Sequence, residues 1–174
     1  MKRELTVIQE MSAKIALGIG VCLALLAPSP TFANEWKIDD TISALDGSRT
    51  YVAMLGSTNT IRDAAGGDEE ATLVIRCSSG SLQTYIAWPR SLGQGPLEMR
   101  WKADAGSFTT EVWSVSADGG ATFSEGARAF LGKLRGAHRA FFQLSLANFD
   151  SLQASFVLAG IDKIVNSALA ICAR

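Results

Sequence analysis

Residues 97–104 read Leu-Glu-Met-Arg-Trp-Lys-Ala-Asp, so apolar and charged side chains alternate at every position. A period of two places one set of side chains on each face of a β-strand. One buried and one solvated face is typical of an antiparallel sheet. The stretch therefore predicts an antiparallel strand whose core-facing residues are Leu97, Met99, Trp101 and Ala103.

Other short apolar segments flank this strand at hairpin spacing, without the long alternation of strands and helices that parallel sheets need. The further strands that we expect cover residues 36–42, 50–55, 72–77, 82–88, 110–116, 139–146 and 152–158. Residues 61–70 lack apolar periodicity and are expected to form a loop, and residues 78–81 a hairpin turn. The predicted fold is mainly β, an antiparallel β-sandwich or partly open barrel, because these architectures cover the apolar face of such a sheet.

Two segments have the apolar spacing of a helix instead. The first covers residues 125–135 as a short insert, with Ser124 as its N-cap and Gly136 as its stop signal. The second is an amphipathic helix over residues 161–172 at the C-terminus. Its apolar stripe comprises Ile161, Ile164, Val165, Ala168, Leu169 and Cys172.

Residues 1–33 have the pattern of a secretory signal peptide. Basic residues, among them Lys2 and Arg3, precede an apolar run at residues 15–27 that is too short to span a bilayer. A Pro-Ser-Pro break and a small residue, Ala33, follow the run, which predicts cleavage after Ala33. We therefore expect an exported, periplasmic chain with a single β-rich domain over residues 34–174 and no stable membrane span after cleavage.

The composition argues against several classes of function. The chain has 174 residues and a formal net charge of -1, whereas proteins with a nucleic-acid partner usually present a basic face. The single histidine, His138, leaves no second imidazole for a metal site or a catalytic pair. We interpret His138 as a surface residue, and we assign no catalytic, cofactor-binding or metal-ligating residue.

Four acidic residues cluster in the expected loop at Asp63, Asp68, Glu69 and Glu70. Carboxylate oxygens are ligands that Ca²⁺ prefers, so a calcium site is one interpretation. The spacing is not that of an EF-hand, and a solvated loop is the interpretation that we favour.

Four tryptophans offer a carbohydrate platform as one hypothesis and core packing as the other. They are Trp36, Trp88, Trp101 and Trp113. Trp101 and Trp113 alternate with polar residues on expected strands, which favours core packing. Trp88 precedes Pro89 at a strand end and is expected to be more exposed.

Residues 116–123 read Ser-Ala-Asp-Gly-Gly-Ala-Thr-Phe, the sharpest local motif of the chain. It resembles the Asp-box of sialidases, which recurs once in each blade of a propeller and lies away from the catalytic site. A single copy in a chain of this length cannot build a catalytic propeller. We therefore interpret the motif as a structural hairpin turn, in which the Asp side chain accepts backbone N–H groups. The residues that carry the turn are Ser116, Asp118, Gly120, Thr122 and Phe123.

Of the three cysteines, Cys22 lies in the expected signal peptide and is removed with it. Two then remain, and an even count in an oxidising compartment indicates a disulfide. Cys77 shares a strand face with Leu73 and Ile75, and Cys172 lies on the apolar stripe of the last helix. Both thiols point toward the core, so we predict a Cys77–Cys172 bond that fastens this helix to the sheet.

A series of landmarks runs through residues 36–172. It comprises Trp36, the strand Leu73-Val74-Ile75-Arg76-Cys77, the segment Tyr85-Ile86-Ala87-Trp88, residues 99–104, 113–118, 121–123 and 156–161, and the final Cys172. Their order resembles the VasI/TagO family, exported accessory proteins associated with type VI secretion. The resemblance implies a periplasmic accessory protein without established catalysis.

Three functional hypotheses follow. The favoured one is a non-enzymatic periplasmic accessory protein that acts by binding an envelope protein. The alternative is a periplasmic binder or inhibitor of cell-wall hydrolases that acts through a loop. A hydrolase is the least favoured, because no nucleophile–base signature is present in the sequence.

Overall fold

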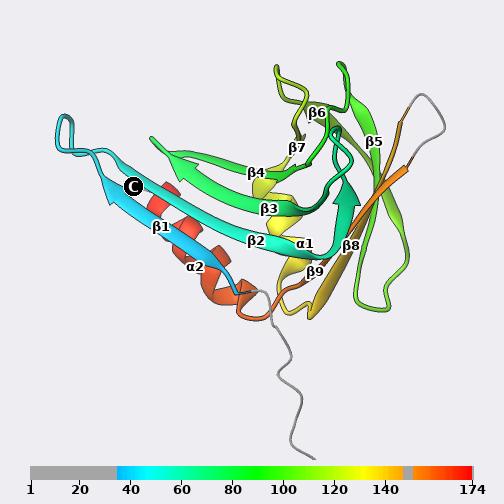
Figure 1. Ribbon diagram of the computed structural model, residues 1–174. Coiled ribbons are helices and arrows are strands. Elements are labelled where there is room, and N and C mark those ends of the chain that lie inside the picture. Colours follow the sequence, from blue (N-terminus) through cyan, green and yellow to red (C-terminus); the bar gives the residue numbers. More distant parts are fainter. Residues whose placement is uncertain (1–34, 147–150, 174) are drawn as a thin grey trace, which may run out of the picture. The chain divides into compact units, whose positions relative to one another are not determined.

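The computed structural model describes residues 35–146 and 151–173, so the expected signal peptide and its cleavage site at Ala33 lie outside the described residues. Within the described part, nine strands form one sheet whose paired neighbours are all antiparallel, and two helices accompany it (Figure 1). The elements are β1 (Lys37–Ile42), β2 (Arg49–Arg62), β3 (Asp68–Ser78), β4 (Ser81–Ala87), β5 (Leu97–Ala103), β6 (Thr109–Val115), β7 (Ala121–Ser124), α1 (Ala127–Leu134), β8 (Arg139–Ser145), β9 (Ser151–Val157) and α2 (Ile161–Cys172). The expected mainly β fold, with a helix insert and a C-terminal helix, is confirmed.

The order of strands across the sheet is β1-β2-β3-β4-β7-β6-β5-β8-β9. β1 to β4 are consecutive hairpins, and the short β7 joins β4 to β6. In Figure 1, β5 and β8 rise steeply beside β1–β4, so this one sheet bends around the core. Closing a bent sheet on itself leaves fewer exposed edges than a flat sheet of the same size would have.

β2 and β9 meet again where β2 bulges, although they are far apart in the sheet order. The register of β2 with β3 shifts within residues 56–60. Thr58 Oγ1 donates a hydrogen bond of 3.1 Å to Ser155 O of β9. The Asn59 side chain donates to Gln153 O at 2.8 Å and accepts from Ser155 N at 2.9 Å. Side chains therefore replace the backbone ladder at this β2–β9 seam, and the result is a partly open barrel.

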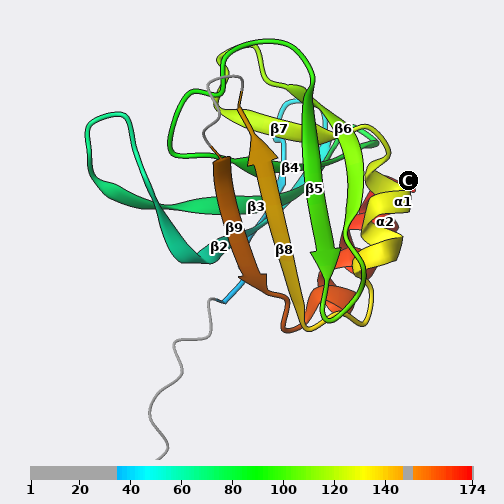
Figure 2. The ribbon, with the colours of Figure 1, turned by 90° about the vertical axis from the view of Figure 1, so that its right-hand side faces the viewer.

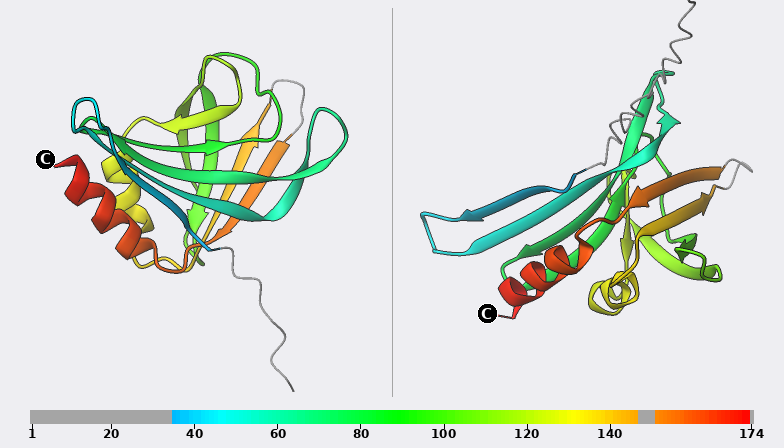
Figure 3. Two further views of the ribbon diagram at one scale, coloured as in Figure 1. Left: turned by 60° about the vertical axis from the view of Figure 1, so that its left-hand side comes forward. Right: turned by 90° about the horizontal axis from the view of Figure 1, so that it is seen from below.

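Both helices pack on the inner side of the bent sheet. α2 lies against β2, β3 and β4 and buries most of its predicted stripe (Figure 3). α1 contributes Phe130, whose ring centroid lies 5.0 Å from that of Trp101 and 5.1 Å from that of Trp113, both edge to face. Edge-to-face aromatic pairs add stabilisation beyond the area they bury. These rings form the centre of the core.

The alternation in residues 97–104 corresponds to the two faces of β5. Met99 and Trp101 are buried, and Leu97 and Ala103 are partly buried against the core. Glu98 and Arg100 are exposed, as their charge requires.

The expected loop at residues 61–70 is wrong. β2 continues to Arg62, and β3 begins at Asp68. Ile61 is buried, and the backbone pairing of β2 with β3 runs from Thr60 opposite Glu70 to Arg62 opposite Asp68. Only residues 63–67 form the turn between them. The cross-strand pairing overrides the absence of apolar periodicity in this segment.

The start of the first helix also differs from the prediction. Ser124 is the last residue of β7 and pairs with Trp113 of β6, so its backbone is committed to the sheet. α1 begins two residues after the expected start, with Gly126 as its N-cap and no side-chain capping bond. Gly136, with φ of 70°, ends the helix as predicted.

Candidate functional site

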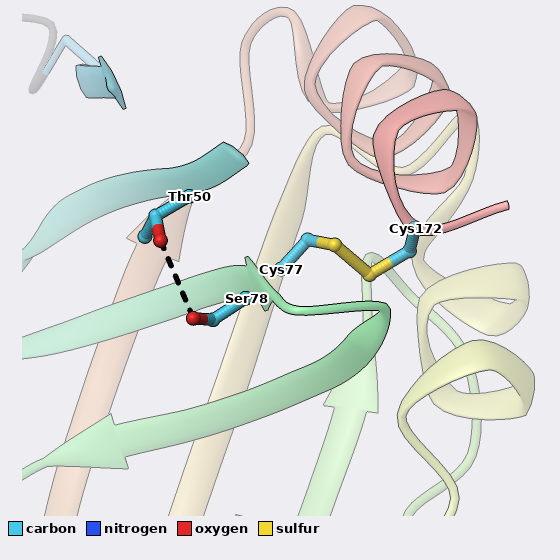
Figure 4. The surroundings of a disulfide bond; sticks show 4 residues. All are labelled: Thr50, Cys77, Ser78 and Cys172. Atoms are coloured by element: carbon cyan, nitrogen blue, oxygen red, sulfur yellow. Dashed lines mark hydrogen bonds between the residues drawn. A yellow bond between two sulfur atoms is a disulfide. The ribbon is translucent and has the colours of Figure 1, made fainter. Parts of the chain in front are cut away.

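The predicted disulfide between Cys77 and Cys172 is present. Their Cα atoms are 5.7 Å apart, and the bond joins β3 to the last turn of α2 (Figure 4). Cys77 is fully buried, and beside it the hydroxyls of Thr50 and Ser78 lie 3.3 Å apart within hydrogen-bond reach. The bond fixes one end of α2 against the hairpin formed by β2 and β3.

We define the hairpin arm as residues 37–54, and its outer strand, β1, is the most exposed strand of the described chain. All six residues of β1 are exposed on both faces of the strand. The exposed fractions of Ile38, Ile42 and Leu45 are 53%, 69% and 99%. Large apolar side chains gathered on one exposed element mark an interaction surface more often than single scattered ones do.

Two contacts hold the hairpin arm against the rest of the domain. At its root, Trp36 Nε1 donates a 3.0 Å hydrogen bond to Ala159 O, just before α2. Further along, Tyr51 is buried, and its hydroxyl lies near the side chain of Ser167 on α2. Burial raises the pKa of Tyr51, and the neighbouring Ser167 partly opposes that rise. The arm is therefore an anchored strand and not a loose loop.

The tip of the arm is a turn built from polar side chains. Ser43 N donates to Ser48 O at 2.8 Å, and Gly47 adopts φ of 68°, which glycine tolerates without strain. Hydrogen bonds from Ser43 and Ser48 lower the pKa of Asp46 to about 2. Behind the tip, Arg49 forms a salt bridge with Asp40 across the two strands. These contacts define the conformation in which Leu45 is presented.

A pocket of about 520 Å³ lies between the tip of the arm, the β3–β4 turn and the end of α2. Its apolar lining residues are Ile42 and Ile171, and Arg49 lines it from β2. Ile171 is the neighbour of the bonded Cys172 in the sequence, so the disulfide positions one wall of this pocket. The exposed side of β1 and the pocket together make the candidate site.

This site could bind an extended peptide through the backbone N–H and C=O groups at the edge of β1. Within residues 35–146 and 151–173, no strand pairs with the outer edge of β1, which is the first strand in the sheet order. Such an edge can take an additional strand, whose main-chain hydrogen bonds give affinity and whose alternate side chains give specificity. Ile38, Asp40 and Ile42 share one face of β1 and would supply that specificity.

The sequence did not single out this arm. The segment Lys-Ile-Asp-Asp-Thr-Ile has the mixed composition of a half-buried strand, and such a strand is what it predicts. Its exposure depends on where α2 lies, because α2 packs against β2, β3 and β4. The adjacent acids Asp39 and Asp40, which place a charge on each face, are the one local signal of exposure.

The turn at residues 116–123 has the predicted construction. Asp118 Oδ1 accepts a hydrogen bond from Gly120 N at 3.0 Å and another from the hydroxyl of Ser116. These bonds hold the pKa of Asp118 below its usual range, the Ser116 hydroxyl having the largest effect. Gly119 adopts the positive φ of 73°. Phe123 leaves the turn and packs on Tyr85, with ring centroids 4.7 Å apart.

The tryptophans do not form a carbohydrate platform. Trp101 and Trp113 are buried in the core as expected. The expected exposure of Trp88 is wrong, because the ring is buried and its Nε1 donates a 3.0 Å hydrogen bond to Thr122 of the turn. A partner hydroxyl inside the domain is what allows this polar ring nitrogen to be buried.

The four acids of the candidate calcium site and His138 lie on different elements and have different structural roles. Asp63 Oδ1 accepts hydrogen bonds from the backbone of Ala65 and Gly67, while Asp68 to Glu70 lie on β3. In the described ranges, no group of three or more His, Cys, Asp or Glu side chains is arranged to hold a metal ion. His138 is exposed at the start of β8, and its backbone N–H donates to Asp104.

None of the described helices has the length and apolar character needed to cross a membrane. No family model matches the chain, and no curated protein matches it at a significant level. Its fold is similar to the crystal structure of invasion associated protein B from Bartonella henselae, with a TM-score of 0.53 at 12% identity. That likeness covers 80% of this chain and 93% of the other, and it shows a shared fold.

Proposed function

We propose that this chain is a non-enzymatic accessory protein of the cell envelope that binds a protein partner along the edge of β1. The observation that carries the proposal is the exposure of all six residues of β1, with Ile38 and Ile42 on one face. An exposed edge of this kind is a liability for aggregation, and natural proteins usually cover or shorten it. Its retention here is explained if a partner strand covers it.

The anchoring of the arm supports this proposal. Trp36 and Tyr51 fix the strand before any partner arrives, so little conformational entropy is lost on binding. The partner strand would place apolar side chains beside Ile38 and Ile42, and a side chain in the pocket next to Ile171. This makes the partner an extended segment with apolar residues at alternate positions.

An exported location is part of the proposal. Residues 1–33 have the pattern of a signal peptide, and a disulfide such as Cys77–Cys172 persists mainly in oxidising compartments. We expect periplasmic protein to begin at Asn34, which N-terminal sequencing would establish. Mature protein that retains residues 15–27 would contradict export by cleavage.

The finer proposal is an accessory role in type VI secretion, for which the support is the VasI/TagO-like order of landmarks. A binder or inhibitor of cell-wall hydrolases remains the alternative. The name of the Bartonella protein associates that protein with invasion. The proposed absence of catalysis predicts that His138→Ala leaves the biological phenotype intact, and a strong loss with the fold preserved would contradict it.

The test is site-specific photocrosslinking in the native envelope. A photoreactive amino acid at Ile42 should capture one specific protein, while the same amino acid at Val112 should not. Val112 is the matched control because it is 56% exposed but lies on β6. Capture of a secretion-system component would support the finer proposal, and capture of a cell-wall hydrolase the alternative. Equal capture at both positions, or none at Ile42, would contradict binding at β1.

A further inference from the structure

A second concave site lies on the outer face of β5 and β8, beside the β2–β9 seam and away from the hairpin arm. It is a pocket of about 310 Å³, within the range of ligand-binding cavities. We call it the basic pocket. Its polar lining residues include Thr58, Lys102, Asp104, Arg139 and Ser155. Phe141 contributes an apolar wall.

Two cations face this pocket from neighbouring strands. Lys102 lies opposite Phe141 in the β5–β8 register, and Arg139 lies two residues from Phe141 on the same face of β8. The two charges are therefore diagonal neighbours across the strands. Arg100 lies two residues before Lys102 on the same face of β5, and its guanidinium is 4.0 Å from the Phe108 ring centroid. Lys102 Nζ lies 4.9 Å from the same centroid.

Among the residues that the structure describes, no carboxylate forms a salt bridge with Lys102 or Arg139. The one acid in the pocket wall is Asp104, and its oxygens accept the backbone N–H groups of His138 and Arg139 at 2.8–3.2 Å. Asp104 therefore accepts hydrogen bonds from the backbone at the start of β8. Its single negative charge balances only one of the two positive charges of Lys102 and Arg139. Lys102 and Arg139 are diagonal neighbours, so their like charges repel each other, and a bound anion would relieve that repulsion.

The shape of the site limits the kind of anion that fits. Nucleic acids and lipid surfaces are bound by broad basic faces that contact many phosphates. Here the cations line a pocket with a carboxylate in its wall, and the chain as a whole has a net charge of -1. A pocket of this kind suits one or two carboxylate side chains, because a guanidinium and an ammonium can both donate to their oxygens.

We propose that the basic pocket binds the carboxylates of an acidic segment from a second copy of this chain. The hairpin of β2 and β3 projects beyond β9 (Figure 2) and carries the exposed acids Asp68, Glu69 and Glu70. These carboxylates are complementary in charge to Lys102 and Arg139.

The test is fluorescence anisotropy with labelled hexaglutamate as the probe, on the full mature protein at low ionic strength. The double variant Lys102→Gln/Arg139→Gln should weaken binding about tenfold or more, because two charge-assisted hydrogen bonds are lost. The control Arg128→Gln/Lys163→Gln removes the same charge from exposed positions on α1 and α2 and should change binding little. Circular dichroism establishes that each variant is folded. If Lys102→Gln/Arg139→Gln does not fold, the single variant Lys102→Gln replaces it in the binding measurement.

Equal weakening in the two double variants, or no weakening in either, would overturn the proposal. Equal binding of labelled hexaglutamine would also overturn it, because that probe carries no carboxylate. Sedimentation equilibrium tests the occupant. The parent should self-associate, and this self-association should be lost both in Lys102→Gln/Arg139→Gln and in Glu69→Gln/Glu70→Gln. A monomer that binds hexaglutamate would overturn the second copy as the occupant and would leave the pocket to an acidic segment of a partner protein.

Discussion

The side chain of Asn59 pairs with the backbone of Ser155 as another strand would, its Oδ1 accepting from Ser155 N at 2.9 Å. Its Nδ2 also donates to Gln153 O. We expect Asn59→Ala to lower the free energy of unfolding by about 1–3 kcal/mol, because backbone groups of β9 lose their partner. Amide exchange at Ser155 should become faster. Thr60→Ala is the control, since Thr60 is exposed on the same strand, and an equal effect there would contradict this role of Asn59.

The disulfide predicts a large effect on stability. It joins residues 95 positions apart, and removing such a cross-link leaves the unfolded chain much freer. Cys77→Ser/Cys172→Ser should lower the free energy of unfolding by about 2–5 kcal/mol in urea titrations. Reduction of the parent protein should have the same effect and should release the end of α2 first. A double variant as stable as the parent would mean that the apolar stripe of α2 holds the helix alone.

Two adjacent glycines in the turn at residues 116–123 should respond differently to alanine. Gly119 has φ of 73°, and a Cβ there would lie 3.0 Å from Gly93 O. Gly119→Ala should therefore cost about 1–2 kcal/mol of stability in thermal or urea unfolding. Gly120→Ala is the matched control, because its Cβ would meet only Asp118 at ordinary contact distance. Equal stability of the two variants would contradict the requirement for glycine at position 119.

Asp104 predicts a dependence of stability on pH. Hydrogen bonds from the backbone of Arg139 and His138 lower its pKa in the folded protein. Its stabilising contribution is therefore present above the pKa of the unfolded chain, about 4, and is lost as the pH falls through the lower folded value. Unfolding free energies between pH 7 and pH 2 should fall more steeply for the parent than for Asp104→Asn. Asparagine also tolerates the positive φ of 46° at this position. Parallel curves would contradict this role for Asp104.

Much of the framework could be predicted from the sequence because it depends on local periodicity. The alternation in residues 97–104 placed Met99 and Trp101 in the core, and the helical stripe at residues 161–172 gave α2 the bounds that the structure has. The two periodicities together placed Cys77 and Cys172 on facing surfaces, where they are bonded. In each case the spacing of apolar residues along the chain predicts which face is buried.

The features that the sequence did not predict depend on partners distant in the chain. Trp88 is buried because Thr122 of β7 accepts its N–H, a contact between β7 and the residue that follows β4. Ser124 cannot cap α1 because it pairs with Trp113. The exposure of β1 follows from the position of α2, and the basic pocket joins Thr58 of the bulge to Arg139 of β8. Apart from the adjacent acids Asp39 and Asp40 on β1, these relationships have no local pattern in the sequence.

The most direct test of binding at β1 is hydrogen–deuterium exchange of this protein with and without the partner that Ile42 captures. β1 is paired with β2, so only alternate amides of β1 point outward. Strand addition predicts that these outward-facing amides exchange rapidly in the free protein and become protected in the complex, while amides in β6 are unchanged. Rapid exchange of the outward-facing amides in the fully bound complex would show that the partner binds elsewhere and would contradict the proposed function.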